Sequence, residues 1–237
     1  MHKATILLPV LLLGGCHAAF GQESRERATR DFQVGAFQKI NAAGSSDVIV
    51  RVGGAPSVHA EGDKKALDAL DIQVVNGQLN IGRKNAGGWS FGWGHHSRLR
   101  ITVTVPSLTG AALAGSGDIR IDKIGGPSFE GSIAGSGDIA IDHLEVGEAR
   151  FSIAGSGDVT AAGKVGKANL STAGSGDMRT GALEAGTASI SVMGSGGAQL
   201  RVTQSADITI MGSGDVHVAG TTNCQIHKAG SGDVHCG

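Results

Sequence analysis

The chain has 237 residues, of which 40 are glycine and none is tyrosine, and its formal net charge is −1. This even charge argues against a nucleic-acid partner, because binding to phosphates needs an excess of Lys and Arg. The length permits one elongated domain. An aromatic content of only 3% suits thin coils filled by Ile, Val, Leu and Ala.

The N-terminal segment, residues 1–16, predicts an export signal. A short basic start precedes an almost wholly apolar run over 4–13, which is too short to span a membrane. Leu13-Gly14-Gly15-Cys16 resembles a bacterial lipobox, so lipidation is expected at Cys16, with ordinary secretion as the alternative. Either route places the protein outside the cytoplasm, as an outer-membrane lipoprotein or as a periplasmic or secreted protein. Membrane contact is then expected only through the lipid anchor.

The next segment, residues 17–31, is charged and polar and cannot bury a core, so it is expected to be a tether. Residues 32–110 are expected to form an atypical N-terminal coil and cap region. Within it, Asp63–Leu70 predicts a helical turn, and Asn76-Gly77 lies between two alternating runs and predicts a β-hairpin. A further alternating strand is expected over 99–105.

A glycine-rich loop, residues 86–97, interrupts this cap region. Its aromatic and histidine side chains are Trp89, Phe91, Trp93, His95 and His96. Exposed aromatic residues on a loop favour contact with a partner, so the loop is the first candidate for a binding surface. The alternative is that these side chains fold back and cover the apolar end of the domain.

The remainder, residues 111–237, is organised by a repeat. Gly-Ser-Gly, nearly always followed by Asp, begins at Gly115, Gly135, Gly155, Gly174, Gly194, Gly212 and Gly230. Alternating apolar residues flank each copy, which is typical of half-buried strands, and Gly-Ser-Gly between strands predicts a corner. One such unit cannot enclose a core, whereas stacked units can. The repeat therefore predicts an all-β fold, a parallel β-helix of about seven regular coils.

A β-propeller is less consistent with the sequence because each blade needs about 40 residues. The order of apolar positions also resembles one bacterial family. It begins with Phe37-x-x-Ile40 and 47–50, continues through the strands ending at Ile81 and Val105-Pro106, and ends in the repeats. This succession is similar to the auto-transporter adhesin head, or GIN, domain, a domain of unknown function. The resemblance implies a single-stranded right-handed β-helix in the bacterial envelope, without established enzymatic residues.

The aspartates of the repeat are expected to form a row along the corners. They are Asp118, Asp138, Asp158, Asp177, Asp215 and Asp233. The row could bind divalent cations, since these prefer carboxylate oxygens. The favoured interpretation is that each Asp accepts hydrogen bonds from its own turn, because Gly197 interrupts the row.

The last two coils carry Asp215-x-His217 and Asp233-x-His235, which stacking would bring together. Such a set predicts a candidate zinc site, with a plain surface ladder as the alternative. Cys224 and Cys236 are candidates for a disulfide in an oxidising compartment. Cys236 also falls in an inward-facing position, where a free cysteine would pack equally well.

The sequence favours a non-catalytic envelope protein that presents a β-helical surface to an unknown macromolecule, protein or glycan, without a cofactor. A polysaccharide-active β-helix is the second hypothesis, with Arg120, Asp122, Asp138 and Asp142 on one face. A purely structural envelope role is the third. The outward Ser/Thr positions are Ser132, Ser152, Ser171, Ser191 and Thr209, which suit a soluble surface.

Overall fold

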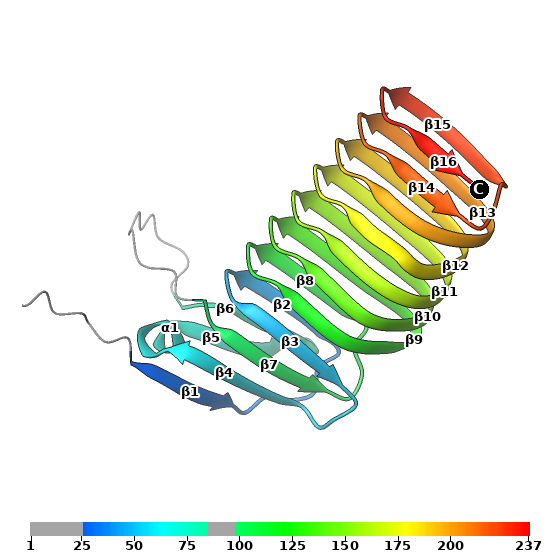
Figure 1. Cartoon of the computed structure of the whole chain (residues 1–237). Coiled ribbons are helices and arrows are strands. Elements are labelled where there is room, and N and C mark those ends of the chain that lie inside the picture. The colour runs from blue at the N-terminus through cyan, green and yellow to red at the C-terminus, as the bar shows by residue number, and fades with distance from the viewer. Residues whose placement is uncertain (1–25, 85–97) are drawn as a thin grey trace, which may run out of the picture.

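The computed structural model describes residues 26–84 and 98–237 and shows a parallel β-solenoid with a modified N-terminal end (Figure 1). The N-terminal elements are β1 (Arg27–Phe32), β2 (Lys39–Gly44), β3 (Asp47–Val52), β4 (Ser57–Asp63), α1 (Lys64–Asp68), β5 (Leu70–Val75), β6 (Gln78–Arg83), β7 (Arg100–Val105) and β8 (Gly110–Gly115). The coils comprise β9 (Ile119–Gly135), β10 (Ile139–Gly155), β11 (Val159–Gly174), β12 (Met178–Gly194), β13 (Ala198–Gly212), β14 (Val216–Ala219), β15 (Cys224–Gly230) and β16 (Val234–Cys236). The predicted all-β solenoid is confirmed. It has about six turns, whereas about seven regular coils were expected.

Two sheets enclose the core. Sheet 1 has the strand order β1-β4-β7-β3-β9-β10-β11-β12-β13-β14-β16. Sheet 2 runs through β5, β6, β2 and β8 and then through the second halves of β9 to β13 to β15. Strands β9 to β13 bend, so each of these coils contributes one strand segment to sheet 1 and one to sheet 2.

The Gly-Ser-Gly corners stack directly on one another. The carbonyl oxygen of Gly115 accepts hydrogen bonds from Ser136 N at 2.9 Å and Gly137 N at 3.1 Å, and the same pair of bonds recurs down the solenoid. The first glycine of each corner has a positive φ, +137° at Gly135. A Cβ on the second, Gly137, would lie 1.9 Å from the carbonyl oxygen of Gly117. The repeat therefore keeps two glycines for two different reasons, backbone conformation and contact between coils.

The opposite bend of each coil varies in length. The coil-to-coil register shifts between Ile141 and Leu144, and again between Thr160 and Gly163. The register through the Gly-Ser-Gly corner stays in step, as in the pairing of Gly155 with Gly174. The change in repeat length from 20 to 18 residues is thus absorbed on the side away from the glycine corner.

The core between the sheets is built from stacks, meaning residues at equivalent positions of successive coils. One stack reads Ile119, Ile139, Val159, Met178, Ala198 and Val216, all buried. The two buried phenylalanines of the regular coils, Phe129 and Phe151, are arranged by size. Phe129 lies over Ala149, and Gly131 lies over Phe151 in the neighbouring stack, so each ring faces a small residue. Such alternation fills the interior without a void.

The N-terminal end contains the predicted hairpin and helix. β5 and β6 pair antiparallel around Asn76 and Gly77, which have φ values of 52° and 73°. Asp63 caps α1 by accepting from the backbone N–H groups of Lys65 and Ala66. Gly44 pairs with Gly115, so β2 and β3 form the atypical first coil.

The prediction of a polar tether to residue 31 is wrong over its last residues, because Arg27–Phe32 form β1 and pair antiparallel with β4. β1 is exposed on alternate residues, and its inward residues Ala28 and Phe32 pack against the core. A few apolar contacts are enough to hold β1 in place, because its backbone also forms hydrogen bonds with β4. The composition of residues 17–31 gives no sign of this pairing with β4.

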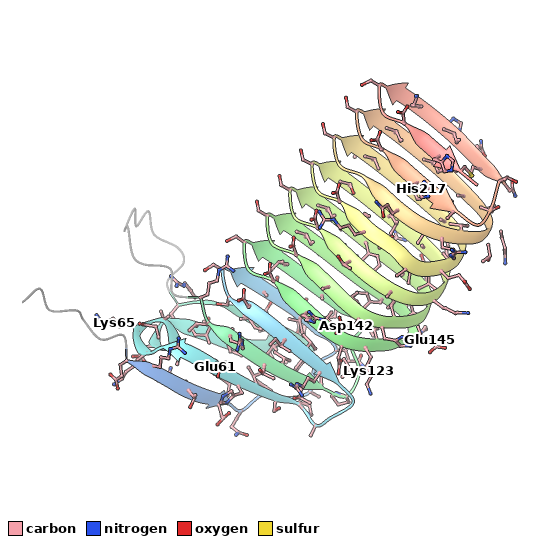
Figure 2. All side chains as sticks on the ribbon, viewed as in Figure 1. Glu61, Lys65, Lys123, Asp142, Glu145 and His217 are labelled. Carbon is pink, nitrogen blue, oxygen red and sulfur yellow. A yellow bond between two sulfur atoms is a disulfide. The ribbon has the colours of Figure 1, made fainter. Side chains whose placement is uncertain are left out.

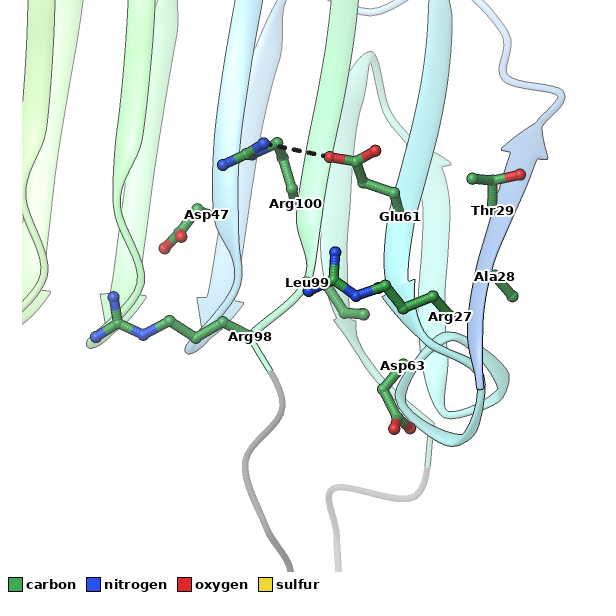
Figure 3. A pocket seen from close by; sticks show the side chains of 10 residues that line it. Arg27, Ala28, Thr29, Asp47, Glu61, Asp63, Arg98, Leu99 and Arg100 are labelled. Carbon is green, nitrogen blue, oxygen red and sulfur yellow. Dashed lines mark hydrogen bonds and ion pairs between the residues drawn. The ribbon is translucent and has the colours of Figure 1, made fainter. Parts of the chain in front are cut away.

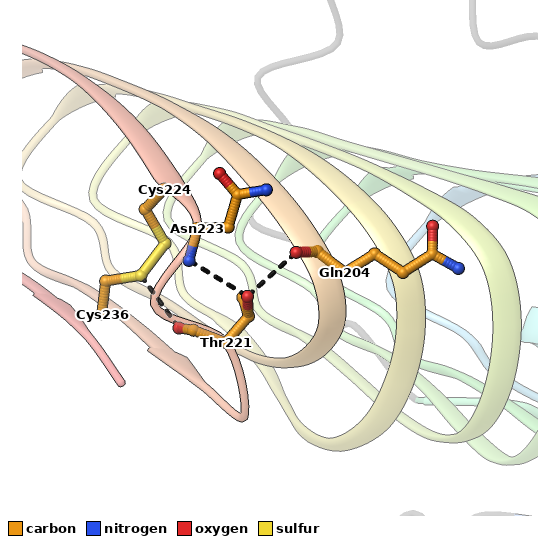
Figure 4. Close-up of a disulfide and its surroundings, with 5 residues drawn as sticks. All are labelled: Gln204, Thr221, Asn223, Cys224 and Cys236. Atoms are coloured by element: carbon orange, nitrogen blue, oxygen red, sulfur yellow. Dashed lines mark hydrogen bonds between the residues drawn. A yellow bond between two sulfur atoms is a disulfide. The ribbon is translucent and has the colours of Figure 1, made fainter.

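The last turn is closed by a disulfide between Cys224 and Cys236, whose Cα atoms are 6.6 Å apart (Figure 4). Cys224 stacks under Ala206 in sheet 2, and Cys236 stacks under Val218 in sheet 1. Cys236 thus occupies the predicted inward position and is also bonded. Beside the bridge, the Thr221 hydroxyl donates to the Gln204 carbonyl and accepts from Asn223 N–H. The disulfide therefore joins the two sheets across the core.

Replacing Cys224 and Cys236 with Ser should loosen the last turn selectively. A bridge closing a loop of this length is worth about 3 kcal/mol. Amide hydrogen exchange in β15 and β16 should therefore accelerate strongly, while the central coils stay protected. Adding reductant to the double variant should change nothing further. Equal protection of β15 and β16 with and without the bridge would contradict the expectation.

Candidate functional site

The strand registers place one continuous row of residues on the outer face of sheet 1, and Figure 2 labels one of them, His217. Each residue pairs with the next across neighbouring strands, and we call this set the outer row. It reads Asp31, His59, Thr102, Ile49, Arg120, Ala140, Thr160, Arg179, Gln199, His217 and His235. Across the eleven strands of sheet 1 it is on the order of 48 Å long. Most of its members carry a hydrogen-bonding group.

Ion pairs fix the charged members of the outer row. Arg120 Nη2 lies 2.9 Å from Asp142 Oδ1, and Arg179 Nη2 lies 2.9 Å from Asp158 Oδ2. At the other end, His59 Nδ1 lies 2.7 Å from Asp31 Oδ1. One partner of each pair is well exposed, although the Asp158 side chain is only 21% exposed, so each pair contributes at most about 1 kcal/mol to stability. Their main effect is to hold guanidinium groups over the sheet, with N–H groups still facing outward.

The repeat aspartates line the corner edge of this face, but they do not bond within their own turns as expected. Asp118 Oδ1 accepts from the backbone N–H of Asp138 at 3.1 Å, and Asp138 Oδ1 accepts from Asp158 N–H at 2.8 Å. The same bond continues to Asp177, and Asp215 accepts from Asp233 N–H. Hydrogen bonds to a charged acceptor are strong and offset repulsion between neighbouring carboxylates. The row is thus an Asp ladder that ties each coil to the next.

Gly197 leaves a gap in the Asp ladder. Asp177 Oδ1 still accepts from Gly197 N–H at 2.8 Å, but Gly197 has no side chain to accept from Asp215. A hollow of about 510 Å³ lies at this position. It is lined by Asp177, Met178, Arg179, Gly197, Ala198, Gln199, Asp215, Val216, His217, Asp233, Val234 and His235. The gap therefore produces a polar depression at the C-terminal end of the outer row.

Replacing Gly197 with Asn should stabilise the protein by about 1 kcal/mol. The amide oxygen would accept from Asp215 N–H, and the unfolded chain would lose freedom. The new Cβ would lie 3.3 Å from the Asp215 carbonyl oxygen and 3.4 Å from Asp177 Oδ1, so a small local shift is needed. Gly197→Ala is the control, having the Cβ without the acceptor. A denaturation midpoint no higher for Asn than for Ala would contradict the repair of the ladder.

The two histidines of the predicted metal site lie on neighbouring strands at this end. The rings of His217 and His235 stack in parallel, with centroids 4.8 Å apart. Asp215 instead binds the backbone of the next coil. Within residues 26–84 and 98–237, no group of three or more His, Cys, Asp and Glu side chains is arranged to hold a metal ion. The metal site therefore stays a prediction, and the described geometry is that of a stacked pair of surface rings.

A second hollow, of about 680 Å³, lies at the N-terminal end of the same face (Figure 3). We call it the arginine hollow. It is lined by Arg27, Ala28, Thr29, Asp47, Glu61, Gly62, Asp63, Arg98, Leu99 and Arg100. Thr29, Glu61, Arg100 and Asp47 pair in succession across β1, β4, β7 and β3. Sequence reasoning missed this set because antiparallel pairing of β1 and β4, distant in sequence, assembles it.

The outer face of sheet 2 is different in character. Its Ser/Thr stack faces outward as expected, and Ser132, Ser152, Ser171, Ser191 and Thr209 pair in register. The neighbouring exposed stack contains Ala134, Ala154, Ala173, Met193 and Met211. A third outward-facing stack of sheet 2 contains Glu130, Arg150, Asn169, Ser189, Asp207 and Gln225, so this face also carries charged and hydrogen-bonding groups beside its small side chains.

The expected binding loop, with Trp89, Phe91, Trp93, His95 and His96, lies outside the described residues, as do the export signal and Cys16. In the part of the chain that is described, no helix is long and apolar enough to cross a membrane. The four residues of the polysaccharide-active hypothesis are partly brought together, since Arg120 contacts Asp142. Asp122 and Asp138 are instead bonded to backbone N–H groups.

Comparison with solved structures identifies similar folds. A "putative adhesin" from Bacteroides fragilis shares 24% identity at a TM-score of 0.78, covering 89% of this chain and 97% of that one. A "putative lipid binding protein" from Parabacteroides distasonis shares 24% identity at a TM-score of 0.70, covering 89% and 96%. A "putative adhesin" from Parabacteroides merdae shares 18% identity at a TM-score of 0.69, with the same coverage. At these identities the likeness concerns the fold alone.

No curated protein matches the chain. A family profile, however, matches residues 36–222, which comprise the first coil, the cap region and nearly all of the solenoid. The family implied by the order of apolar positions is therefore confirmed. The chain belongs to the family described as "Putative auto-transporter adhesin, head GIN domain".

Proposed function

We propose that this protein is an exported, non-catalytic component of the bacterial envelope that binds a hydrophilic polymer along the outer row. The observation that carries the proposal is the row itself. Eleven side chains lie in register on one face, and most of them can donate or accept hydrogen bonds. An extended polymer meets such a face repeatedly, so weak contacts add along its length.

Sheet 1 is the better binding face of the two. Arg120 and Arg179 supply several N–H donors each, and the Asp ladder supplies acceptors beside them. Sheet 2 also carries the charged residues Glu130, Arg150 and Asp207, but its two neighbouring stacks consist of small hydroxyls, alanines and methionines, which give less specificity. A glycan fits sheet 1 well because its hydroxyl groups both donate and accept. The predicted lipid anchor at Cys16 would attach the N-terminal side to a membrane and leave the solenoid outside.

The polysaccharide-active alternative has weaker support from the geometry. Two of its four residues, Asp122 and Asp138, accept backbone hydrogen bonds that hold coils together. A general acid must instead reach the glycosidic oxygen. A purely structural role predicts no ligand at all, so a binding measurement separates it from the proposal.

The test uses the purified full-length protein on immobilised neutral and acidic polysaccharides. Replacing Arg120 and Arg179 with Gln should weaken binding at least about tenfold, since a hydrogen bond to a charged group contributes about 1.5–3 kcal/mol. Arg150→Gln is the matched control, because Arg150 is an exposed arginine of sheet 2 paired with Glu148. Binding that is unaffected by the double variant would contradict the proposal, and release of new reducing ends would show catalysis.

A further inference from the structure

The arginine hollow is lined by charged residues of both signs. Its lining includes Arg27, Arg98 and Arg100 and the acids Asp47, Glu61 and Asp63. Some of these are already engaged. Arg100 Nη1 lies 3.4 Å from Glu61 Oε1, and Asp63 caps α1. Three charged groups, Arg27, Arg98 and Asp47, then remain to be explained.

Arg27 and Arg98 are exposed and form no ion pair or side-chain hydrogen bond with any described residue. Figure 3 shows the Arg27 side chain between Glu61 and Asp63, and the Arg98 side chain on the side of Asp47. Two uncommitted guanidinium groups on one hollow favour an anion. A guanidinium fork binds a carboxylate or phosphate through two parallel hydrogen bonds.

Asp47 departs from the Asp ladder. It occupies the ladder position of the first coil, since Val48 pairs with Ile119, which follows Asp118. In every later coil that has this Asp and is followed by another coil, an oxygen of the Asp accepts an N–H from that next coil. Asp47 Oδ1 is instead buried and has no hydrogen-bond partner among the described residues. A buried acceptor without a partner is costly, which is a reason to expect a donor that residues 26–84 and 98–237 do not supply.

The presence of both arginines and acidic residues in the hollow favours some anions over others. A phosphate-rich ligand would place its charges beside Asp47, Glu61 and Asp63, which line the same hollow and repel it. A sugar carrying one carboxylate has one charge for the arginines and hydroxyl donors for the acids. The hollow's volume of about 680 Å³ lies within the usual range for small-ligand sites.

We propose that the arginine hollow binds a uronic acid residue of an acidic polysaccharide. Arg27 and Arg98 hold the sugar carboxylate, and Asp47 and Glu61 accept from its hydroxyl groups. The inference rests on the proposed function in one respect, because the hollow ends the same face along which a glycan would lie. It adds the class of glycan and the end of the face at which the charged residue is recognised.

The experiment titrates the full-length protein with galacturonate and with tetragalacturonate. Comparison ligands are the methyl ester of tetragalacturonate, which lacks the charge, and pyrophosphate, which lacks the hydroxyls. Arg27→Gln, Arg98→Gln and their combination are compared with Arg150→Gln on sheet 2. Unchanged thermal melting shows that each variant is folded.

We expect the double variant to weaken tetragalacturonate binding at least tenfold, and Arg150→Gln to leave it unchanged. Methyl esterification should cause a similar loss. Pyrophosphate should bind more weakly than tetragalacturonate, and Asp47→Asn should strengthen it by removing a repelling charge. Equal or tighter binding of pyrophosphate in the original protein would overturn the assignment to a sugar acid.

The failures of the two proposals differ. If tetragalacturonate binding depends on Arg120 and Arg179 but not on Arg27 and Arg98, the proposed function stands and the hollow is excluded. If galacturonate binds through Arg27 and Arg98 but no polysaccharide binds along the outer row, the inference about the hollow stands and the proposed function fails. Absence of binding by any acidic sugar overturns the inference.

Discussion

Gly155→Ala should destabilise the solenoid by about 3–5 kcal/mol, enough to unfold much of a marginally stable protein. Gly155 has a φ of +138°, which L side chains rarely adopt. An added Cβ would also lie 2.2 Å from the carbonyl oxygen of Gly135. That oxygen belongs to the backbone of the neighbouring coil and accepts two hydrogen bonds, so it cannot move aside without opening the corner.

Alanine substitutions at three further glycines distinguish the effect of the positive φ from the effect of the clash between coils. Gly126 has a φ of +138° with no atom near the added Cβ, whereas Gly157 has only the contact, 2.0 Å from the Gly137 carbonyl oxygen. Gly125 has neither, since its nearest neighbour is 3.9 Å away. Denaturant unfolding should rank Ala at 125 near zero, Ala at 126 and 157 intermediate, and Ala at 155 lowest. A Gly155→Ala variant as stable as Gly125→Ala would show that the corners do not hold the coils in register.

The periodic part of the fold could be predicted because its information is local and repeated. Each Gly-Ser-Gly corner and its alternating flanks specify one coil, and stacking follows from the need to bury the apolar faces. The hairpin at Asn76-Gly77 and the capped helix after Asp63 are local signals of the same kind. These elements are confirmed.

The features that sequence reasoning missed depend on pairing between distant segments. The sequence of β1 predicts a tether, because nothing in these residues indicates that they pair with β4. The arginine hollow follows from that pairing and from the position of β7 between β4 and β3. The direction of the Asp bonds was missed for a related reason. A carboxylate at a corner reaches its own turn and the next coil about equally, and only the stacked backbone decides between them.

The core sets a second limit on prediction. The alternation of apolar and polar residues shows which side chains face inward. It does not show which large and small side chains pack against each other. Thr172 and Thr180 are fully buried, and only Thr180 donates a hydrogen bond, to the Gln199 carbonyl. Both have aliphatic neighbours in their stacks, Val192 beside Thr172 and Leu200 beside Thr180. The solenoid therefore tolerates local polar groups while keeping the backbone ladder continuous, which is what keeps the outer row straight enough to meet a polymer.

The second large effect is expected at Phe151, which is fully buried between Gly131 above and Leu170 below. Phe151→Ala should cost about 3–5 kcal/mol because it leaves a cavity that rigid coils cannot close. Phe151→Leu should cost less, since Leu170 and Ile190 already show that the stack accepts aliphatic side chains. Equilibrium denaturation of the two variants would measure both losses of stability.

Gly131 supplies the matched test of this packing. A Cβ on Gly131 would lie 2.7 Å from Phe151 Cδ1, so Gly131→Ala should destabilise the original protein by about 1–3 kcal/mol through overpacking. In the Phe151→Leu background that clash is absent, and the same substitution should be nearly neutral. The double-mutant cycle should therefore give a coupling of at least about 1 kcal/mol. Additive effects would mean that the ring moves freely within its stack, and the size-matched core would then not be what sets the spacing of the coils.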